Sequence, residues 1–272
     1  MKLLKYVKQD SNIIYSNIQI IIFFSIFLII SLSYIHANAD KPSLFQNIII
    51  ENSKIKSLDS NITQYINTNE GSPVIFKGRY RVDNNGRFRI DYSLPSKQIV
   101  INDGANLYWY YPEEKILYTI GNEHNSSSAP KINPLKKFSK NPDNRFNVNY
   151  LGKHLFGFFI IAHQFLIMDQ ISGKTFEIWI DAKRRVILAK IVKDKDGREI
   201  IKENYGEYRK ISQGGSREKI YFPLQIDVYA RTNLGITRNS THYDNVRLNL
   251  VILKKIFHID FPDDIKKKYL YK

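Results

Sequence analysis

The sequence predicts an α+β fold that is mainly β, in which one helix leads into a long antiparallel meander. Short segments with alternating apolar and polar residues follow one another along most of the chain, separated by glycine, proline and asparagine turn signals. One stretch near the start has apolar residues at helical spacing instead. The chain contains no cysteine, which excludes disulfides, zinc–thiolate sites and thiol catalysis.

Residues 1–39 have the pattern of a signal peptide. Three lysines precede an apolar run over residues 18–32, and Ala37 and Ala39 form a small-x-small cleavage site. We therefore expect export, cleavage after Ala39 and a mature domain over residues 40–272. The alternative is an uncleaved inner-membrane anchor, although the run is short of the roughly 20 apolar residues that a spanning helix needs.

The chain is strongly basic, with 41 lysines and arginines against 26 acidic residues and a net charge of +15. Removing residues 1–39 takes away three lysines and one aspartate and leaves +13. Export argues against a nucleic-acid partner, and most cations interleave with acidic and apolar residues. A solvated surface is the simpler interpretation, and a basic patch facing a membrane or a protein partner is the alternative. Lys266, Lys267 and Lys268 form a run of cations.

A helix is expected over residues 42–57. Leu44, Ile48 and Ile55 fall near helical spacing behind Ser43, which is a suitable N-cap residue. The next run, over residues 61–68, alternates apolar and polar side chains and is expected to form the first strand.

The clearest part of the pattern is a meander around an Arg-Phe-Arg-Ile-Asp-Tyr strand. Phe88, Ile90 and Tyr92 point to one side of this strand, and the charged residues between them point to the other. Asn-Gly and Asp-Gly pairs, with Gly86 and Gly104, suit tight hairpin turns because glycine accepts a positive φ at low cost.

The apolar face of this meander carries large side chains. We expect it to continue through Ile99, Ile101, Leu107, Trp109 and Tyr111. Side chains of this size line a wide cavity as readily as they fill a core, so the pattern leaves both possibilities open.

Residues 121–144 form a connection long enough to suggest a function. The segment is polar, contains several prolines, and exceeds the roughly 12 to 15 residues that loops in compact domains rarely pass. Residues 134–138 have the pattern of a short helix with proline in its first turn.

The second half of the chain is expected to consist mostly of strands. Residues 155–166 fit either a strand buried on both faces or a helix. In the run over residues 174–181, Phe176, Ile178 and Ile180 share one face. Further strands are expected over residues 186–193, 199–211, 224–231, 235–238 and 240–256.

The sequence contains no motif for catalysis or cofactor binding. It has no glycine-rich phosphate loop, no nucleophile elbow and no His-Glu-x-x-His helix, and its six histidines lack metal-ligand spacing. We therefore expect a binding protein and not an enzyme, with no catalytic residues, no metal and no cofactor.

The meander and the end of the chain together resemble a known family. An aromatic strand, a proline break, a Gln-Ile-Val-Ile-Asn-Asp-Gly strand and a Leu-Tyr-Trp-Tyr-Tyr-Pro strand follow one another in this order. This order is similar to that of the LolA family, the periplasmic lipoprotein carriers of the Lol pathway. The Phe-His-Ile-Asp-Phe-Pro sequence near the end extends the similarity over most of residues 40–272.

The resemblance implies an incomplete, strongly curved antiparallel β-barrel of about 10 to 12 strands, with an N-terminal helix and short lid helices over a hydrophobic cavity. Leu135 and Phe138 would belong to the lid, and a plain surface loop is the alternative for residues 121–144. The implied cavity residues are Phe88, Ile90, Tyr92, Ile99, Ile101, Leu107, Trp109, Tyr111, Phe176, Ile178 and Ile180.

The resemblance also implies a function. Such a protein takes a lipoprotein from an ABC-type release complex of the inner membrane, shields its acyl chains, and passes it to an outer-membrane acceptor that the sequence leaves unknown. In the family an arginine just before a proline ties down the lid. The matching place here is Asn84-Asn85, so no arginine latch is carried over. The alternative is a LolA-like envelope module, a lipid-binding sensor or structural component without shuttle activity.

Overall fold

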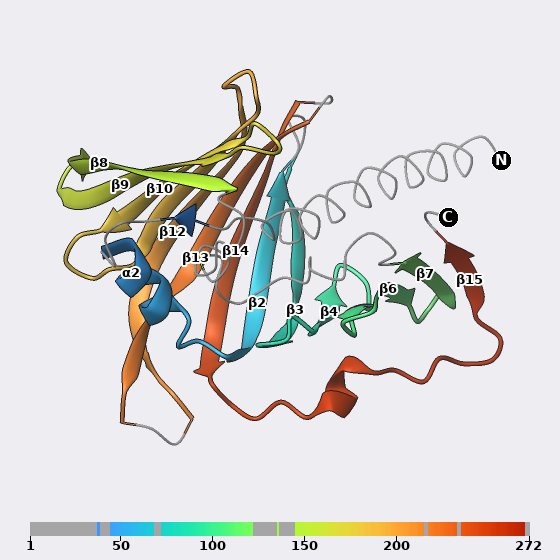
Figure 1. Ribbon diagram of the computed structural model, residues 1–272. Coiled ribbons are helices and arrows are strands. Elements are labelled where there is room, and N and C mark those ends of the chain that lie inside the picture. The colour runs from blue at the N-terminus through green and yellow to red at the C-terminus, as the bar shows by residue number, and fades with distance from the viewer. Residues whose placement is uncertain are drawn as a thin grey trace.

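The computed structural model describes residues 37–38, 44–67, 72–121, 135, 145–214, 217–232 and 235–269. Its strands form one 15-stranded sheet in the order β1-β8-β9-β10-β11-β12-β13-β14-β2-β3-β4-β5-β6-β7-β15. The sheet bends strongly around one face, and its two edge strands do not pair with each other (Figure 1). The predicted α+β, mainly β fold with an incomplete, curved sheet is confirmed, with more strands than expected.

Almost all neighbouring strands are antiparallel. The exceptions are the two edges, where β1 pairs with β8 and β15 pairs with β7 in parallel. The elements are β1 (Ala37–Asn38), α2 (Leu44–Asn52), β2 (Ser57–Asn67), β3 (Val74–Asp83), β4 (Phe88–Leu94), β5 (Gln98–Asn102), β6 (Asn106–Tyr111), β7 (Ile116–Gly121), β8 (Phe146–Phe156), β9 (Ile160–Asp169), β10 (Thr175–Asp181), β11 (Ile187–Lys193), β12 (Glu199–Ser212), β13 (Lys219–Thr232), β14 (Gly235–Leu248), η2 (Lys254–Phe257) and β15 (Lys266–Tyr269).

Aspartates at strand ends close several of the hairpins. The Asp83 carboxylate accepts hydrogen bonds from the backbone N–H groups of Asn85 and Arg87 at 2.9 and 3.1 Å. The Asp181 carboxylate accepts from Lys183 and Arg184 at 2.8 and 2.7 Å in the same way. Burial disfavours the charged form of Asp181, but these bonds and the Arg184 guanidinium outweigh it, so the pKa of Asp181 lies below its usual value. Such side-chain-to-backbone bonds stabilise tight turns.

Bulges account for much of the curvature. The register shifts within the pairs β3–β4, β8–β9, β10–β11, β11–β12 and β14–β2. Each bulge bends a strand and increases its twist. The β3–β4 bulge lies at Gly78, where an added Cβ would sit only 2.4 Å from the Asp91 carbonyl oxygen. A side chain at this position would push the two strands apart.

Helix α2 is shorter than the predicted helix over residues 42–57. It buries Phe45, Ile48 and Ile49, which lie on one side of the helix. The strand that follows starts at Ser57, four positions before the predicted start at residue 61. In the part of the chain that the structure describes, no helix is long and apolar enough to cross a membrane.

The chain after β14 corrects the prediction of one strand over residues 240–256. The strand ends at Leu248, and the chain then runs along the outer face of the meander through the 3-10 turn η2 to β15 (Figure 1). We call residues 249–265 the C-terminal strap. Phe257 of the strap is buried beneath the Arg87 guanidinium, whose carbon lies 5.2 Å from the ring centroid. The Phe261 ring lies 5.7 and 5.5 Å from the rings of Tyr108 and Tyr110.

Candidate functional site

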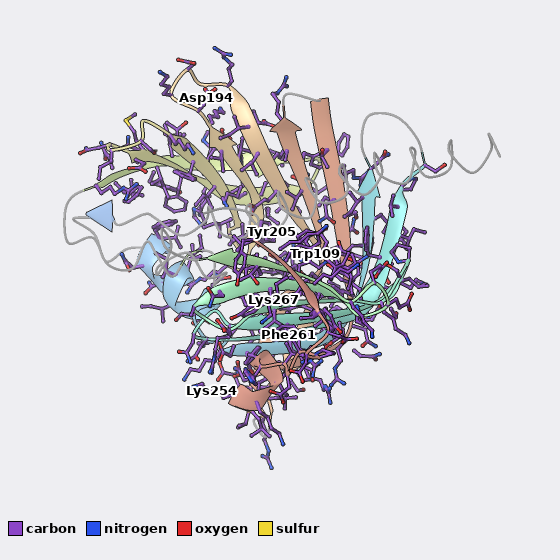
Figure 2. All side chains as sticks on the ribbon, turned by 90° about the vertical axis from the view of Figure 1, so that its right-hand side faces the viewer. Trp109, Asp194, Tyr205, Lys254, Phe261 and Lys267 are labelled. Carbon is purple, nitrogen blue, oxygen red and sulfur yellow. The ribbon has the colours of Figure 1, made fainter. Side chains whose placement is uncertain are left out.

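The candidate site is the inner face of the curved sheet, which carries two apolar clusters. The first, the meander cluster, consists of Leu58, Ile62, Ile66, Phe76, Val82, Phe88, Ile90, Tyr92, Val100, Leu107, Trp109, Tyr111, Ile220, Phe222 and Leu248. Six of the predicted cavity residues belong to it: Phe88, Ile90, Tyr92, Leu107, Trp109 and Tyr111. In Figure 2, Trp109 lies toward the middle of the molecule, whereas Asp194 lies at the far end of a hairpin.

The aromatic side chains of the meander cluster hold one another in place. The indole of Trp109 stacks on the Tyr111 ring at 5.5 Å, and its Nε1 donates a hydrogen bond to Gln98 Oε1 at 3.2 Å. The Phe76 and Tyr92 rings meet edge to face at 5.5 Å. Trp109 is only 3% exposed, so these side chains fill the inner face at this end of the sheet.

Ile99 and Ile101 do not share this face, which corrects their predicted place in the cavity. Their register partners on β4 are Asp91 and Arg89, which alternate with the inward Phe88, Ile90 and Tyr92. Ile99 and Ile101 therefore point outward, toward the side on which the C-terminal strap runs. Ile101 is nevertheless fully buried on this outer side of the sheet.

The second cluster, the helix cluster, lies against α2. It consists of Phe45, Ile48, Ile49, Leu135, Phe146, Phe165, Ile167, Phe176, Ile178, Ile180, Ile187 and Val192. The predicted residues Phe176, Ile178 and Ile180 are all here, in a cluster separate from that of Trp109. Leu135, predicted as a lid residue, is fully buried in the same cluster. Phe138 and the predicted lid helices lie outside the described residues.

A buried ion pair lies beside the helix cluster on the same face. Lys190 pairs with Ile178 of β10 and with Glu203 of β12 in the strand register, so all three side chains point inward. The Lys190 Nζ lies 3.0 Å from Glu203 Oε1, and each residue is 3% exposed. The Tyr205 hydroxyl donates a hydrogen bond to the other carboxylate oxygen of Glu203.

The environment shifts the proton affinities of this group. Burial lowers the pKa of Lys190, and the Glu203 carboxylate only partly opposes that effect. Burial, reinforced by the Glu203 charge, raises the pKa of Tyr205 well above its ordinary value. Tyr205 therefore remains a neutral hydrogen-bond donor at physiological pH.

Further polar side chains continue from this group across the inner face. The register runs from Tyr205 through Ile226 to Thr241 and Gln64 on successive strands. Gln64 Nε2 donates to Thr241 Oγ1 at 3.1 Å, and Gln64 Oε1 accepts from the Tyr92 hydroxyl at 2.5 Å. We call Lys190, Glu203, Tyr205, Thr241 and Gln64 the polar seam. The polar seam crosses the inner face from the helix cluster, beside Lys190, to the meander cluster, where Gln64 bonds to Tyr92.

The sequence profile described as "Outer membrane lipoprotein carrier protein LolA" matches residues 53–202, which is more than half of the chain. The protein belongs to the LolA family. The match spans both Trp109 and the ion pair's Lys190, so it covers most of the inner face. A search of curated proteins finds no match.

Solved structures share the LolA-type fold at low identity. A DUF1329 family protein from Desulfovibrio piger aligns with TM-score 0.60 and 13% identity over 81% of this chain and 98% of its own. A putative outer membrane lipoprotein-sorting protein domain from Vibrio parahaemolyticus aligns with TM-score 0.57 and 11% identity over 79% and 94%. A LolA superfamily protein from Nitrosomonas europaea aligns with TM-score 0.54 and 11% identity over 80% and 98%. These identities show the fold alone.

The outer face of this LolA family member offers a different kind of site. A pocket of about 230 Å³ is lined by Glu199, Ile200, Lys202, Asn204, Tyr229, Arg231 and Ile236. Lys202 and Asn204 flank the inward Glu203, so this pocket lies on the side of β12 that faces away from the polar seam. Among the described residues, no cluster of three histidine, aspartate or glutamate side chains is suited to hold a metal ion.

Sequence reasoning predicted an apolar face with Ile48 on the N-terminal helix, but it missed Phe45, Ile49 and the polar seam. Lys190 lies two residues from Leu188 and from Val192, and Glu203 lies two residues from Ile201 and from Tyr205, so each charge occupies the same-face position of an apolar pattern. A lysine and a glutamate that occupy apolar positions of two neighbouring strands are a detectable signal of a buried pair. The tight turn at Asp196-Gly197 joins these two strands and sets the register in which Lys190 lies opposite Glu203.

Proposed function

We propose that this protein is an exported carrier that shields the acyl chains of lipoproteins on their way from the inner to the outer membrane. Its membership of the LolA family and the apolar inner face of its curved sheet support this proposal. Each methylene group kept from water contributes about 0.8 kcal/mol, so a lipid with two or three chains needs such shelter to cross an aqueous compartment. The aromatic and aliphatic inner face is the observation that carries the proposal.

The carrier needs a way to admit chains into an inner face that its own side chains fill. Helix α2 and Leu135 cover Phe176, Ile178 and Ile180, and neither belongs to the sheet. We expect acyl chains to replace these covering groups in the helix cluster. The Asn84-Asn85 position supplies no arginine latch, and we expect the closed state to depend mainly on apolar contacts, each worth up to about 1.5–3 kcal/mol when fully buried.

Replacing Leu135 by serine is expected to loosen this cover. Binding of an environment-sensitive apolar dye should rise, and the complex should lose an acylated lipoprotein roughly 10-fold faster because fewer apolar groups close over its chains. Retention of the same cargo without acyl chains should not change. Leu253→Ser, at a position that is 53% exposed, is the matched control. Unchanged dye binding together with unchanged cargo retention would contradict the role of Leu135 as a cover.

The partners of the proposed cycle are an ABC-type release complex in the inner membrane, which delivers the cargo, and an outer-membrane acceptor. Mass spectrometry of the protein purified from its native envelope tests the carrier function itself. Acylated lipoproteins should copurify. A preparation that holds protein partners but no acylated species would instead support the LolA-like envelope module. The closely filled meander cluster, with Trp109 3% exposed, is the observation that favours that second candidate.

The proposal places the protein in the periplasm. We expect the osmotic-shock fraction to contain a soluble chain that begins at Asp40, because residues 1–39 have the pattern of a cleaved signal peptide. Terminal sequencing or intact-mass measurement checks this. A full-length chain that resists carbonate extraction would show instead that residues 1–39 anchor the protein in the inner membrane.

A further inference from the structure

The tip of the β8–β9 hairpin exposes two adjacent phenylalanines. Phe158 is 87% exposed and Phe159 is 92% exposed. They lie in the short connection after Phe156, which pairs with Ile160 across the hairpin. Gly157 starts the turn with φ +61°, a conformation that glycine adopts without strain. The two rings lie 6.2 Å apart and form one apolar projection.

The two strands next to the tip also carry exposed apolar side chains. Leu155 is 62% exposed on β8, and Ile161 is 59% exposed on β9. Isolated exposed apolar residues are common, but loop tips usually carry small or polar residues, and a contiguous apolar group of this kind marks a binding surface. The Trp179 ring lies 5.5 Å from the Phe156 ring, so a third strand extends the aromatic surface.

Cations surround this projection. The turn after β10 lies beside it, because the Ala182 N–H donates to the Ile161 carbonyl oxygen at 3.0 Å. This turn carries Lys183 and Arg185, both exposed, and the exposed Lys153 lies across the hairpin from His163. No carboxylate of the described residues forms an ion pair with any of these three cations. Residues 146–168 contain no aspartate or glutamate, and the one acidic residue of the hairpin, Asp169, lies at its far end and pairs with Arg145.

We propose that the β8–β9 tip inserts into the interfacial region of an anionic lipid bilayer. Phe158 and Phe159 would enter between the headgroups, and Lys153, Lys183 and Arg185 would contact lipid phosphates. Aromatic side chains are favoured at this depth, and each lysine or arginine near an anionic surface adds attraction. A narrow convex projection with a cationic rim matches a deformable lipid surface better than the flat or concave surface of a protein partner.

This inference does not depend on acyl-chain transport, because the tip is not part of either inner cluster. In a carrier, it would hold the protein at the membrane from which lipid is taken or to which lipid is given. In an envelope module, it would hold the protein on the membrane surface.

Vesicle flotation tests the proposal with the exported protein, whose N-terminus is first verified to be the same in every variant. The probes are vesicles of phosphatidylethanolamine with phosphatidylglycerol and vesicles of phosphatidylcholine alone. We expect binding to the anionic vesicles, weakened by salt. Phe158→Ser/Phe159→Ser should reduce this binding by roughly 10- to 100-fold. Lys153→Gln/Lys183→Gln/Arg185→Gln should reduce it by about fivefold per charge.

Val251→Ser/Leu253→Ser is the matched control, because it removes exposed apolar side chains from the C-terminal strap and should leave binding unchanged. In the Phe159→Trp variant, the added indole fluorescence should shift to shorter wavelength on anionic vesicles and be quenched by brominated acyl chains. Equal vesicle binding by the Phe158→Ser/Phe159→Ser variant would overturn the proposal. So would a finding that this variant changes only self-association or only capture of a protein partner.

Discussion

Lys190→Met is expected to lower the free energy of unfolding by about 3–5 kcal/mol. The Glu203 carboxylate is 3% exposed, and its cation at 3.0 Å is Lys190. Removing the ammonium group leaves a negative charge inside the inner face, where water cannot solvate it. Methionine keeps most of the apolar volume of the lysine stem, so the loss reports the charge and not a cavity.

The control for this substitution is Lys193→Met on the same strand. Lys193 Nζ lies 3.3 Å from Glu177 Oε2, but the lysine side chain is 35% exposed, so we expect a loss of at most about 1 kcal/mol. The triple variant Lys190→Met/Glu203→Leu/Tyr205→Phe should recover most of the stability, because it removes the stranded carboxylate and the hydroxyl that donates to it. Urea unfolding measures all three variants. Equal losses for Lys190→Met and Lys193→Met would show that the pair is not buried in solution.

The meander could be predicted from the sequence because its local signals agree. Gly86 and Gly104 have φ of +81° and +101°, as the Asn-Gly and Asp-Gly turns require. Phe88, Ile90 and Tyr92 alternate with charged residues and share the buried face. A strand with one apolar and one charged face has only one way to lie on a core.

The next strand, β5, shows why the rest could not be predicted. Gln98 and Asn102 point inward and Ile101 points outward, yet all three are buried, because both faces of this strand are covered. The inward amides satisfy their polar atoms locally, since Gln98 accepts from Trp109 and Asn102 accepts from the Gly104 N–H at 2.8 Å. On the outward side, the C-terminal strap contacts Arg89 and Tyr108, the register partners of Ile101 on the two neighbouring strands. The strap lies more than 140 residues later in the chain, and a local apolar pattern carries no information about it.

The candidate site was predictable where it depends on strand alternation and unpredictable where it depends on which strands become neighbours. The alternation of Phe176, Ile178 and Ile180 correctly indicated one buried face. It did not indicate that β10 and the Trp109 strand lie far apart in the strand order, which divides the apolar residues into two clusters. The polar seam arises from the same strand order, because it joins side chains of β11, β12, β14 and β2.

Phe257→Ala is expected to lower the free energy of unfolding by about 3–5 kcal/mol, the usual cost of truncating a fully buried phenylalanine. Phe257 is 2% exposed, and its ring lies under the Arg87 guanidinium. The neighbouring Ile256 carbonyl oxygen accepts a hydrogen bond from Arg89 Nη1 at 3.3 Å. We therefore expect the Phe257 ring to fix the C-terminal strap against the outward side of β4. Figure 2 shows Phe261 farther along the strap.

We expect Phe257→Ala to destabilise the strands next to the strap more than the rest of the sheet. Without the Phe257 ring, the strap loses its main apolar contact at β4, so hydrogen exchange of the β4–β6 amides should accelerate more than that of β10–β12. Val251→Ala is the matched control, since Val251 is 91% exposed on the same strap and should change stability by less than about 0.5 kcal/mol. If Phe257→Ala unfolded at the same urea concentration as Val251→Ala, the strap would contribute nothing to the fold. The outward burial of Ile101 would then need another cover.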